Sequence, residues 1–225
     1  MRSARGDAPT PEPEIVAIEE ILRAWFPPSY FVKAARLADH PLLPEEWPFV
    51  ARAVARRRQE FATGRWLSRE GLRSFALPDA PIGVGRLHEP LWPAGVSGAI
   101  SHDADVCVVV LARWTPPEAA SFGVDLASLV RRQEPVAELA PIFLANCAEL
   151  DAMSAFGLDV DPALLLFSLK ESIVKAISAR VGEFLDLKAL EICGIGRASH
   201  NGHIFRMEMR ASATDRFLLT AVREL

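Results

Sequence analysis

The chain has 225 residues, enough for one large domain or for two lobes of roughly half that length. Half of the residues are hydrophobic and 24% are charged, which excludes a disordered, fibrous or collagen-like protein. Because the formal net charge is −4, general attraction to nucleic acid or to an anionic membrane is not expected, and any basic site has to be local.

The first part of the chain predicts helices. Residues 1–13 are rich in Pro, Arg and Asp and show no period, so we expect a frayed lead-in there. Apolar residues at helical spacing predict a helix over Ile15–Phe26, whereas the pattern over Tyr30–Leu43 is ambiguous. A stronger helix is predicted over Trp47–Phe75, where Gly64 would let a neighbouring element pack closely.

Strands are predicted in the middle of the chain. The Pro- and Gly-rich residues 76–98 are typical of a loop with fixed turns. A short strand follows over Ala99–His102, and the continuous apolar run Val106–Ala112 predicts a central strand buried on both faces. Thr115-Pro116-Pro117-Glu118 interrupts this pattern, and we place a boundary between two lobes there.

The second half repeats this order of elements. A strand is predicted over Ser121–Leu126, followed by mixed helical patterning over residues 131–157. A strong helix is predicted over Pro162–Val181 and should end at the glycine that follows it. Strands complete the tail, with a hairpin signal at His200-Asn201-Gly202 and a last strand over Phe217–Val222.

The order of elements indicates a roughly duplicated α+β protein. We expect a flexible lead-in over residues 1–13, an N-terminal lobe over residues 14–117 and a C-terminal lobe over residues 118–225.

Two further features concern the cellular compartment. The first 14 residues lack the apolar stretch of a signal peptide, and no segment approaches 18 continuous apolar residues, so a cytoplasmic protein without a membrane span is predicted. Cys107, Cys147 and Cys193 form no Cys-x-x-Cys pattern and have apolar neighbours, which favours small core side chains over a redox or zinc site.

Arginines crowd the helix predicted over Trp47–Phe75. They are Arg52, Arg56, Arg57, Arg58, Arg65, Arg69 and Arg73. A solvated helix face would explain this composition. However, Arg58 and Arg65 lie two turns apart on one face, and guanidinium groups suit phosphate better than ammonium groups do. An anionic ligand or an acidic partner is therefore the sharper hypothesis.

Two further polar groups lie at predicted strand ends. In Gly98-Ala99-Ile100-Ser101-His102 the histidine is either a core residue bonded to the backbone or a donor to a phosphate, with Ser101 as a second donor. In Gly123-Val124-Asp125 the carboxylate is either a cap or loop anchor, or a ligand for an oxygen-preferring cation such as Mg²⁺.

Charged residues interrupt the apolar helix predicted over Pro162–Val181. Glu171 and Lys175 are four residues apart in the order that favours an ordinary helix ion pair. Because charged groups on a mostly buried helix are costly unless they pair or line a cleft, we expect Lys170, Glu171 and Lys175 to face a cleft.

Five segments between residues 50 and 180 occur in a recognisable order. They are Arg57-Arg58-Gln59-Glu60-Phe61 with Gly64-Arg65, Glu89-Pro90-Leu91-Trp92-Pro93-Ala94-Gly95, Gly98-Ala99-Ile100-Ser101-His102, Gly123-Val124-Asp125, and Phe167-Ser168-Leu169-Lys170-Glu171 with Lys175-Ala176. In order and spacing they resemble the motifs of the 4′-phosphopantetheinyl transferases of the surfactin-synthetase and enterobactin-synthetase type. The strand pattern after residue 183 also fits that family.

The resemblance implies a fold and a reaction. The fold would be a pseudo-twofold α+β protein of two similar lobes, each with helices packed on a small, mainly antiparallel sheet, and with coenzyme A in the cleft between them. The reaction would be Mg²⁺-dependent transfer of 4′-phosphopantetheine from coenzyme A to a serine of an apo carrier protein (acyl, peptidyl or aryl), releasing 3′,5′-ADP, with Mn²⁺ as an alternative metal. Such a fold is complete in one chain and implies a monomer.

Roles carry over from the family residue by residue. Arg57 and Arg65, with His102, would hold the 3′-phosphate or neighbouring phosphates. Asp125 and Glu171 would bind Mg²⁺, and Lys175 would touch the diphosphate. Because charge accumulates on the diphosphate oxygens, these two acids and Lys175 would carry the catalysis. The remaining candidates for binding coenzyme A are Arg58, Arg86, Ser101 and Lys170.

Two positions depart from the family pattern. Ala127 stands where the family's Gly-Ile-Asp-x-Glu motif has a second acidic metal ligand, and Ala99 stands where serine is common. Mg²⁺ often binds through one or two carboxylates with substrate phosphates and waters, so Asp125 and Glu171 could suffice, with weaker metal affinity. The alternative is a catalytically impaired module that binds coenzyme A or a carrier protein.

Overall fold

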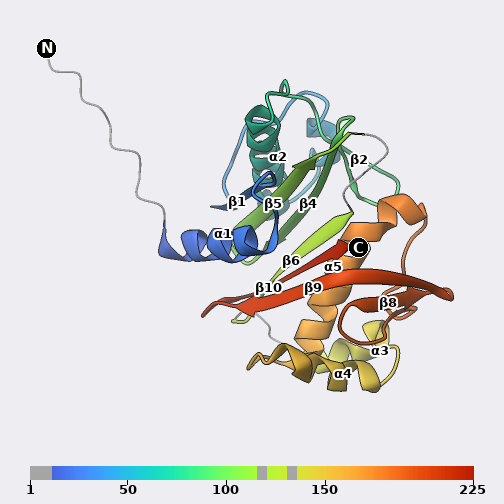
Figure 1. Ribbon diagram of the computed structural model, residues 1–225. Helices are drawn as coiled ribbons and strands as arrows, with labels where there is room; N and C mark the ends of the chain where they lie inside the picture. Colours follow the sequence, from blue (N-terminus) through green and yellow to red (C-terminus); the bar gives the residue numbers. More distant parts are fainter. Residues whose placement is uncertain (1–11, 116–120, 131–135) are drawn as a thin grey trace, which may run out of the picture.

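The computed structural model describes residues 12–115, 121–130 and 136–225, and two antiparallel sheets form its centre (Figure 1). In the described residues the first sheet has the strand order β1 (Phe31–Arg36), β5 (Val106–Arg113), β4 (Val96–Asp103). The second has the order β6 (Phe122–Ser128), β10 (Phe217–Glu224), β9 (His203–Ala213), β8 (Arg197–His200), β7 (Leu190–Ile192). A small ribbon pairs β2 (Gly83–Val84) with β3 (Pro90–Leu91).

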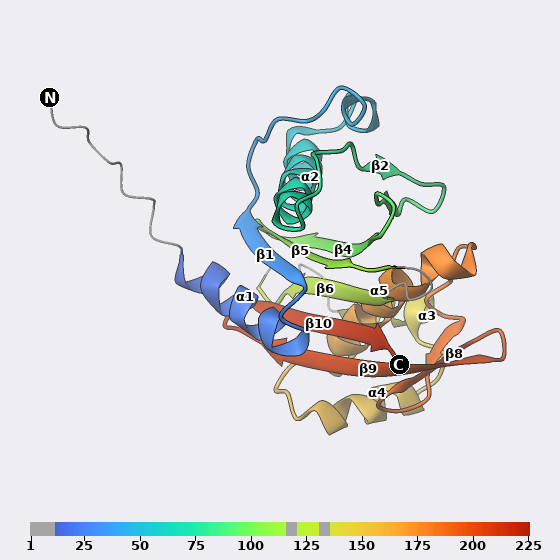
Figure 2. The same ribbon diagram turned by 45° about the horizontal axis from the view of Figure 1, so that its top comes forward.

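Three long helices pack on these sheets (Figure 2). They are α1 (Pro13–Trp25), α2 (Ala55–Ser74) and α5 (Pro162–Val181). Helix α2 packs on the first sheet, α5 on the second, and α1 on β1 and β10. The shorter helices are η1 (Trp47–Phe49), η2 (Val136–Leu139), α3 (Ala140–Phe143), α4 (Ala148–Met153) and η3 (Ser154–Phe156).

Strand β5 connects two hydrophobic clusters. Its side chains at positions 107, 109 and 111 pack beneath α2, whereas those at 106, 108, 110 and 112 join a cluster shared by α1, β6 and β10. The central strand buried on both faces that the apolar run predicts is therefore confirmed. A third cluster lies between α5 and the C-terminal strands.

The two sheets repeat one order of pairing. In the sequence β1, α2, β4, β5, the strands β1 and β4 both pair with β5. In the sequence β6, α5, β9, β10, the strands β6 and β9 likewise both pair with β10. The mixed α+β class is thus confirmed, and this order is the one that a duplicated plan predicts. The twofold axis itself stays a prediction, and the lobe boundary at residues 117 and 118 lies outside the described residues, as does most of the predicted lead-in.

The sheets meet along β4 and β6. The Ser101 hydroxyl accepts a hydrogen bond from the Leu126 N–H, and the Asp103 carboxylate accepts one from the Ser128 N–H. These side chains pair with N–H groups of β6, which is an edge strand of its sheet. The contact fixes Ser101 beside Asp125, in the middle of β6 rather than near its end.

Two glycines allow close packing around the site. A Cβ on Gly123 would lie 1.9 Å from the Ser172 carbonyl oxygen, so α5 can rest on β6 only with glycine there. A Cβ on Gly64 would lie 3.1 Å from Ile100 Cγ2, which confirms the close approach that this mid-helix glycine predicts.

The structure corrects several element boundaries. The helix predicted from Trp47 begins at Ala55, because Val54 is extended and Glu46 turns inward to accept hydrogen bonds from the N–H groups of Leu43 and Ile82. The ambiguous residues 30–43 contain β1, and the predicted loop 76–98 contains β2, β3 and the start of β4.

The cysteines differ in their exposure. Cys107 is buried as expected, but Cys147 and Cys193 are exposed, so the core interpretation of those two is wrong. Among the described residues no helix is long and apolar enough to cross a membrane.

Candidate active site

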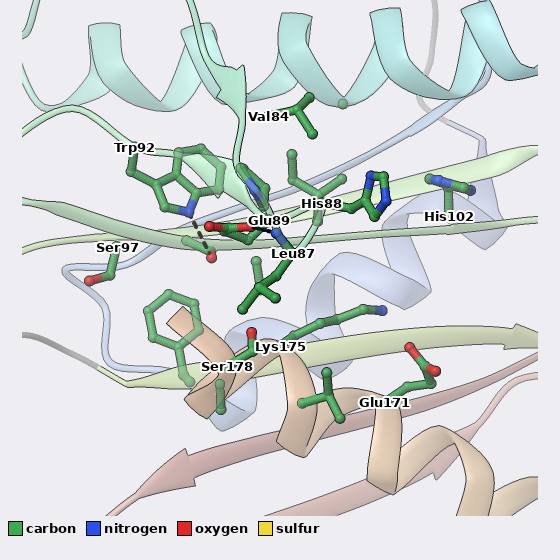
Figure 3. A pocket seen from close by; sticks show the side chains of 18 of the residues that line it. Val84, Leu87, His88, Glu89, Trp92, Ser97, His102, Glu171, Lys175 and Ser178 are labelled. Carbon is green, nitrogen blue, oxygen red and sulfur yellow. Dashed lines mark hydrogen bonds between the residues drawn. The ribbon is translucent and has the colours of Figure 1, made fainter. Parts of the chain in front are cut away.

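A cavity of about 620 Å³ lies between α2 and β4 on one side and α5 on the other. This volume lies within the usual range for a small-molecule site. Figure 3 shows the two ends of the cavity: His102, Lys175 and Glu171 gather at one end, whereas Trp92, Ser97 and Ser178 lie toward the other. The first end thus gathers an imidazole, an ammonium group and a carboxylate, and the lining as a whole also includes aromatic and aliphatic side chains such as Trp92, Phe122 and Val174.

Arg57, Glu60 and His102 form a cluster at the ionisable end. Arg57 Nη1 lies 3.1 Å from His102 Nε2 and 3.3 Å from Glu60 Oε2, and His102 Nδ1 lies 3.7 Å from the same glutamate. Because Arg57 can only donate, a neutral His102 accepts at Nε2 and carries its proton on Nδ1. Burial lowers the pKa of His102; Glu60 and Asp103 oppose this shift, whereas Arg57 and Lys175 add to it.

Lys175 and Asp125 form an ion pair behind this cluster. The Lys175 Nζ atom lies 2.6 Å from Asp125 Oδ1 and 3.1 Å from the Ser101 hydroxyl oxygen. Ser101 donates its one proton to Asp125 Oδ1 at 2.9 Å, so its donor capacity is used inside the protein. The expectation that Ser101 donates to a phosphate therefore disagrees with this geometry.

Glu171 lines the cavity one helical turn before Lys175. No hydrogen bond or ion pair reaches its carboxylate from the described residues. Burial raises the pKa of Glu171; Lys175 opposes the shift and the charge of Asp125 adds to it. A half-buried carboxylate without a partner is a group poised to accept a proton or to bind a cation.

Asp125 and Glu171 are the groups here that could hold a metal ion. Their oxygens are the ligands Mg²⁺ prefers, and two carboxylates suffice where phosphate and water supply the remaining ligands. Ala127, on the same face of β6 as Asp125, is buried in the C-terminal hydrophobic cluster and offers no ligand. No group of three His, Cys, Asp or Glu side chains in the described residues could hold a metal ion alone. The pair therefore fits a cation that takes further ligands from a bound phosphate.

The remaining candidate arginines donate hydrogen bonds to backbone carbonyls of the protein itself. Arg65 lines the cavity but donates to the carbonyls of Ile82 and Gly83, and burial lowers its pKa to about 10, which leaves it charged at neutral pH. Arg58 donates to the Ala53 carbonyl outside the cavity wall. Exposed Arg86 donates to the carbonyl of Gly182 at the end of α5, a bond that links the segment between β2 and β3 to α5.

Lys170 does not face the cleft. Its side chain is 0% exposed and pairs with Glu149 at 2.9 Å, while its Nζ also donates to the carbonyls of Phe143 and Leu187. The expectation of a cleft-lining, ligand-binding Lys170 is therefore corrected: of the two possibilities for a charge on a buried helix, pairing is the one observed.

Glu60 lies within a motif of the sequence, but the motif assigns it no role. It follows Arg56 and Arg57 by four and three residues, a spacing that places all three on one helix face, and it bonds both. That spacing was the available signal, but it does not reveal His102, which comes from β4.

Comparisons with known proteins identify the family of the chain. The pattern of the 4′-phosphopantetheinyl transferase N-terminal domain matches residues 45–112, and that of the 4′-phosphopantetheinyl transferase superfamily matches residues 121–215. The chain is similar to 4′-phosphopantetheinyl transferase Svp of Streptomyces mobaraensis, with 37% identity over 172 residues, or 73% of this chain and 68% of that protein.

Two further relatives match over shorter regions. 4′-Phosphopantetheinyl transferase PptT of Mycobacterium tuberculosis is 45% identical over 83 residues, 37% of this chain and 36% of that protein. Enterobactin synthase component D of Salmonella typhi is 35% identical over 130 residues, 57% of this chain and 52% of that protein. The chain thus spans about half of these two relatives or less.

Proposed function

The chain belongs to the 4′-phosphopantetheinyl transferase superfamily, and from this we propose that it transfers 4′-phosphopantetheine from coenzyme A to a serine of an apo carrier protein. The observation that carries the proposal is the cavity between the lobes, which gathers Arg57, His102, Lys175 and Glu171 at one end. We take the N-terminal lobe as residues 14–117 and the C-terminal lobe as residues 118–225.

Binding of coenzyme A uses the charged end of the cavity. Arg57 and His102 would hold the 3′-phosphate, and the charge of Arg65 behind them supports an anion in that place. Lys175 would contact the diphosphate while keeping its ion pair with Asp125. Arg58, Arg86 and Ser101 bond the protein's own backbone or Asp125, so they are not proposed as ligands of coenzyme A.

The transfer itself is a displacement at phosphorus. The carrier serine oxygen forms a bond to the phosphorus that bears pantetheine, the bond from that phosphorus to the bridging oxygen breaks, and 3′,5′-ADP leaves with the electron pair. Glu171 would accept the serine proton, a role that suits a carboxylate whose pKa is raised by burial. Lys175 would stabilise the negative charge that grows on the diphosphate oxygens.

A divalent cation fits beside these groups. Asp125 and Glu171 would hold Mg²⁺ or Mn²⁺, which when bound neutralises charge on the diphosphate. Because Ala127 supplies no third carboxylate, we expect the cation to bind weakly until coenzyme A contributes its phosphate oxygens.

The carrier protein would approach along the start of α2. Arg52, Arg57 and Arg58 lie there beside the half-exposed Phe49. The carrier proteins that this family modifies usually present an acidic helix, so this basic surface would steer their association.

The experiment is Mg²⁺-dependent labelling of a panel of apo carrier proteins from a fluorescent coenzyme A, with the wild type and Ala127→Glu compared. We expect labelling by the wild type and a change of less than about tenfold in the variant, since two carboxylates can hold the cation. Tight coenzyme A binding without any labelling at high Mg²⁺ would reject the proposal.

Ala127 and the Lys175–Asp125 pair favour one second candidate, an impaired module that binds coenzyme A or a carrier protein. A large gain by Ala127→Glu from near-zero activity would support it. Thermal unfolding of both proteins shows whether the buried glutamate is tolerated.

The pH dependence of coenzyme A binding provides a test of His102. Its pKa is lowered in the free protein, so the imidazole is neutral at pH 7, and a phosphate beside it would favour the protonated form. Binding should therefore take up a proton, and affinity should rise as the pH falls from 8 toward 6, by up to about tenfold per pH unit.

Calorimetry in two buffers of different ionisation enthalpy measures this uptake. His102→Gln should remove most of it, and what remains in that variant belongs to the phosphate of coenzyme A and to Glu171, whose pKa is raised by burial. Equal proton uptake by the wild type and the variant would show that His102 does not contact the phosphate.

A further inference from the structure

A chain of buried hydroxyl groups runs behind Asp125. Ser168 and Ser172 on α5 and Thr220 on β10 are each 0% exposed. Ser168 Oγ lies 2.7 Å from Asp125 Oδ2 and 2.9 Å from Thr220 Oγ1, which in turn lies 2.8 Å from Ser172 Oγ. The four polar side chains therefore form one connected line from the helix interior to the carboxylate.

One bond of this chain takes its direction from the carboxylate. An ionised Asp125 can only accept, so Ser168 gives it its single proton. The single proton of Thr220 lies within reach of both Ser168 Oγ and the Ser168 carbonyl oxygen, at 2.9 and 3.0 Å. Ser172 lies within reach of both Thr220 Oγ1 and the Thr220 carbonyl oxygen, at 2.8 and 3.2 Å. The carboxylate therefore fixes the direction of one bond in this chain, the bond from Ser168 to Asp125.

The second oxygen of Asp125 is held from the other side. Oδ1 accepts from Ser101, which belongs to the first lobe, and from Lys175. In the described residues the hydrogen-bond donor to Oδ2 is Ser168. This bond fixes the rotation of the carboxylate about the Cβ–Cγ bond of Asp125. With both oxygens held, Oδ1 stays directed toward Lys175 and the cavity.

We propose that Ser168 is a positioning residue for Asp125, an inference that rests on the proposed function. It does not touch coenzyme A; it holds the carboxylate in the one orientation from which Asp125 can bind Lys175 and share a cation with Glu171. Groups that orient a metal ligand in this way typically change metal affinity or activity by about 10–100-fold when they are removed.

The test compares Ser168→Ala with Ser172→Ala. Both variants lose an equally buried hydroxyl from α5, but only the first breaks a bond to Asp125. The measurements are kcat, the KM for coenzyme A, Mn²⁺ affinity in the presence of coenzyme A by electron paramagnetic resonance, and the Tm.

For Ser168→Ala we expect kcat and Mn²⁺ affinity to fall by about 10–100-fold, with the KM for coenzyme A within about threefold of wild type. Ser172→Ala should change kcat and Mn²⁺ affinity by less than about threefold at a similar loss of Tm. Ser168→Thr, which restores the hydroxyl, should recover most of the lost kcat.

Equal losses in the two alanine variants, or a loss of Tm alone, would show that Ser168 is only a core residue. If the wild type binds Mn²⁺ but labels no carrier protein, the proposed function fails while Mn²⁺ affinity still decides the role of Ser168. If it does neither, Asp125 has nothing to position and the inference is overturned as well.

Discussion

Replacing Lys170 with methionine is expected to lower the free energy of unfolding by about 3–5 kcal/mol, the usual cost of leaving a buried charge without its partner. Glu149 would keep only the hydrogen bonds from the N–H groups of Ala145 and Ile192. The carbonyls of Phe143 and Leu187 would each lose a donor. The loss therefore concerns the packing of α4 and of the segment after α5, not the cavity.

Urea unfolding measures this loss, and the double variant Lys170→Met/Glu149→Gln is its control. Removing both charges should recover part of the stability, because the isolated carboxylate is the main penalty, whereas Gln can accept from only one of the N–H groups of Ala145 and Ile192. Coenzyme A affinity, measured well below the Tm, should stay within about threefold of wild type for the double variant. If Lys170→Met keeps wild-type stability but no longer binds coenzyme A, Lys170 is a ligand-binding residue after all.

Lys170 also shows what the sequence can and cannot predict about the site. A lysine on an apolar helix must pair or line a cleft, and the sequence permits both. The partner, Glu149, lies 21 residues away in a region of mixed helical patterning, where no spacing rule points to it. The environment of Lys170 therefore depended on tertiary packing that periodicity does not encode.

Elements with a strong local signal were predicted well. The helix Pro162–Val181 has Asp161 as its N-cap, Pro162 in its first turn and Gly182 with a positive φ at its end, and the observed bounds match. The turn at Asn201-Gly202 likewise has positive φ at both residues and joins β8 to β9. In both cases the residues that end the element carry the information.

Elements whose burial depends on polar contacts were predicted less well. Helix α2 buries Arg65 and Arg69 through bonds to backbone carbonyls and to Glu46, so its buried face does not follow an apolar stripe. Strand β1 carries Lys33 and Arg36 among small residues and lies at a sheet edge, which explains its ambiguous pattern. The burial of such positions can be predicted only when their hydrogen-bond partners and neighbouring strands are known.

The site shows the same division. The sequence points to Arg57, His102, Asp125 and Lys175 as candidate site residues. The structure brings their side chains to one end of the cavity or directly behind it. The hydrogen bond that Ser101 donates to Asp125 was not predictable from the sequence, because the two residues come from different sheets. The motif order identifies the groups, but their hydrogen bonds decide which of them stay free for a ligand.

Replacing Glu171 with glutamine is expected to lower kcat by about 10²–10⁴-fold, the range for loss of a general base. The variant keeps the size of the side chain but loses both the proton acceptor and one of the two carboxylates beside the diphosphate. Without Mg²⁺, coenzyme A should bind the variant as tightly as the wild type or more tightly, because a negative charge next to the bound anion has been removed. With Mg²⁺, the variant should lose most of the gain in affinity that the wild type shows.

Single-turnover transfer and calorimetry with and without Mg²⁺ measure these effects separately, with Glu183→Gln as the control. Glu183 is exposed just beyond the end of α5, so its replacement changes the net charge by the same amount without altering the cavity. The control reproduces the long-range effect of losing one negative charge. Any difference between the two variants therefore arises from the position of Glu171 in the cavity. Wild-type kcat in Glu171→Gln would mean that the serine proton leaves by another route and that Asp125 holds the cation without this partner.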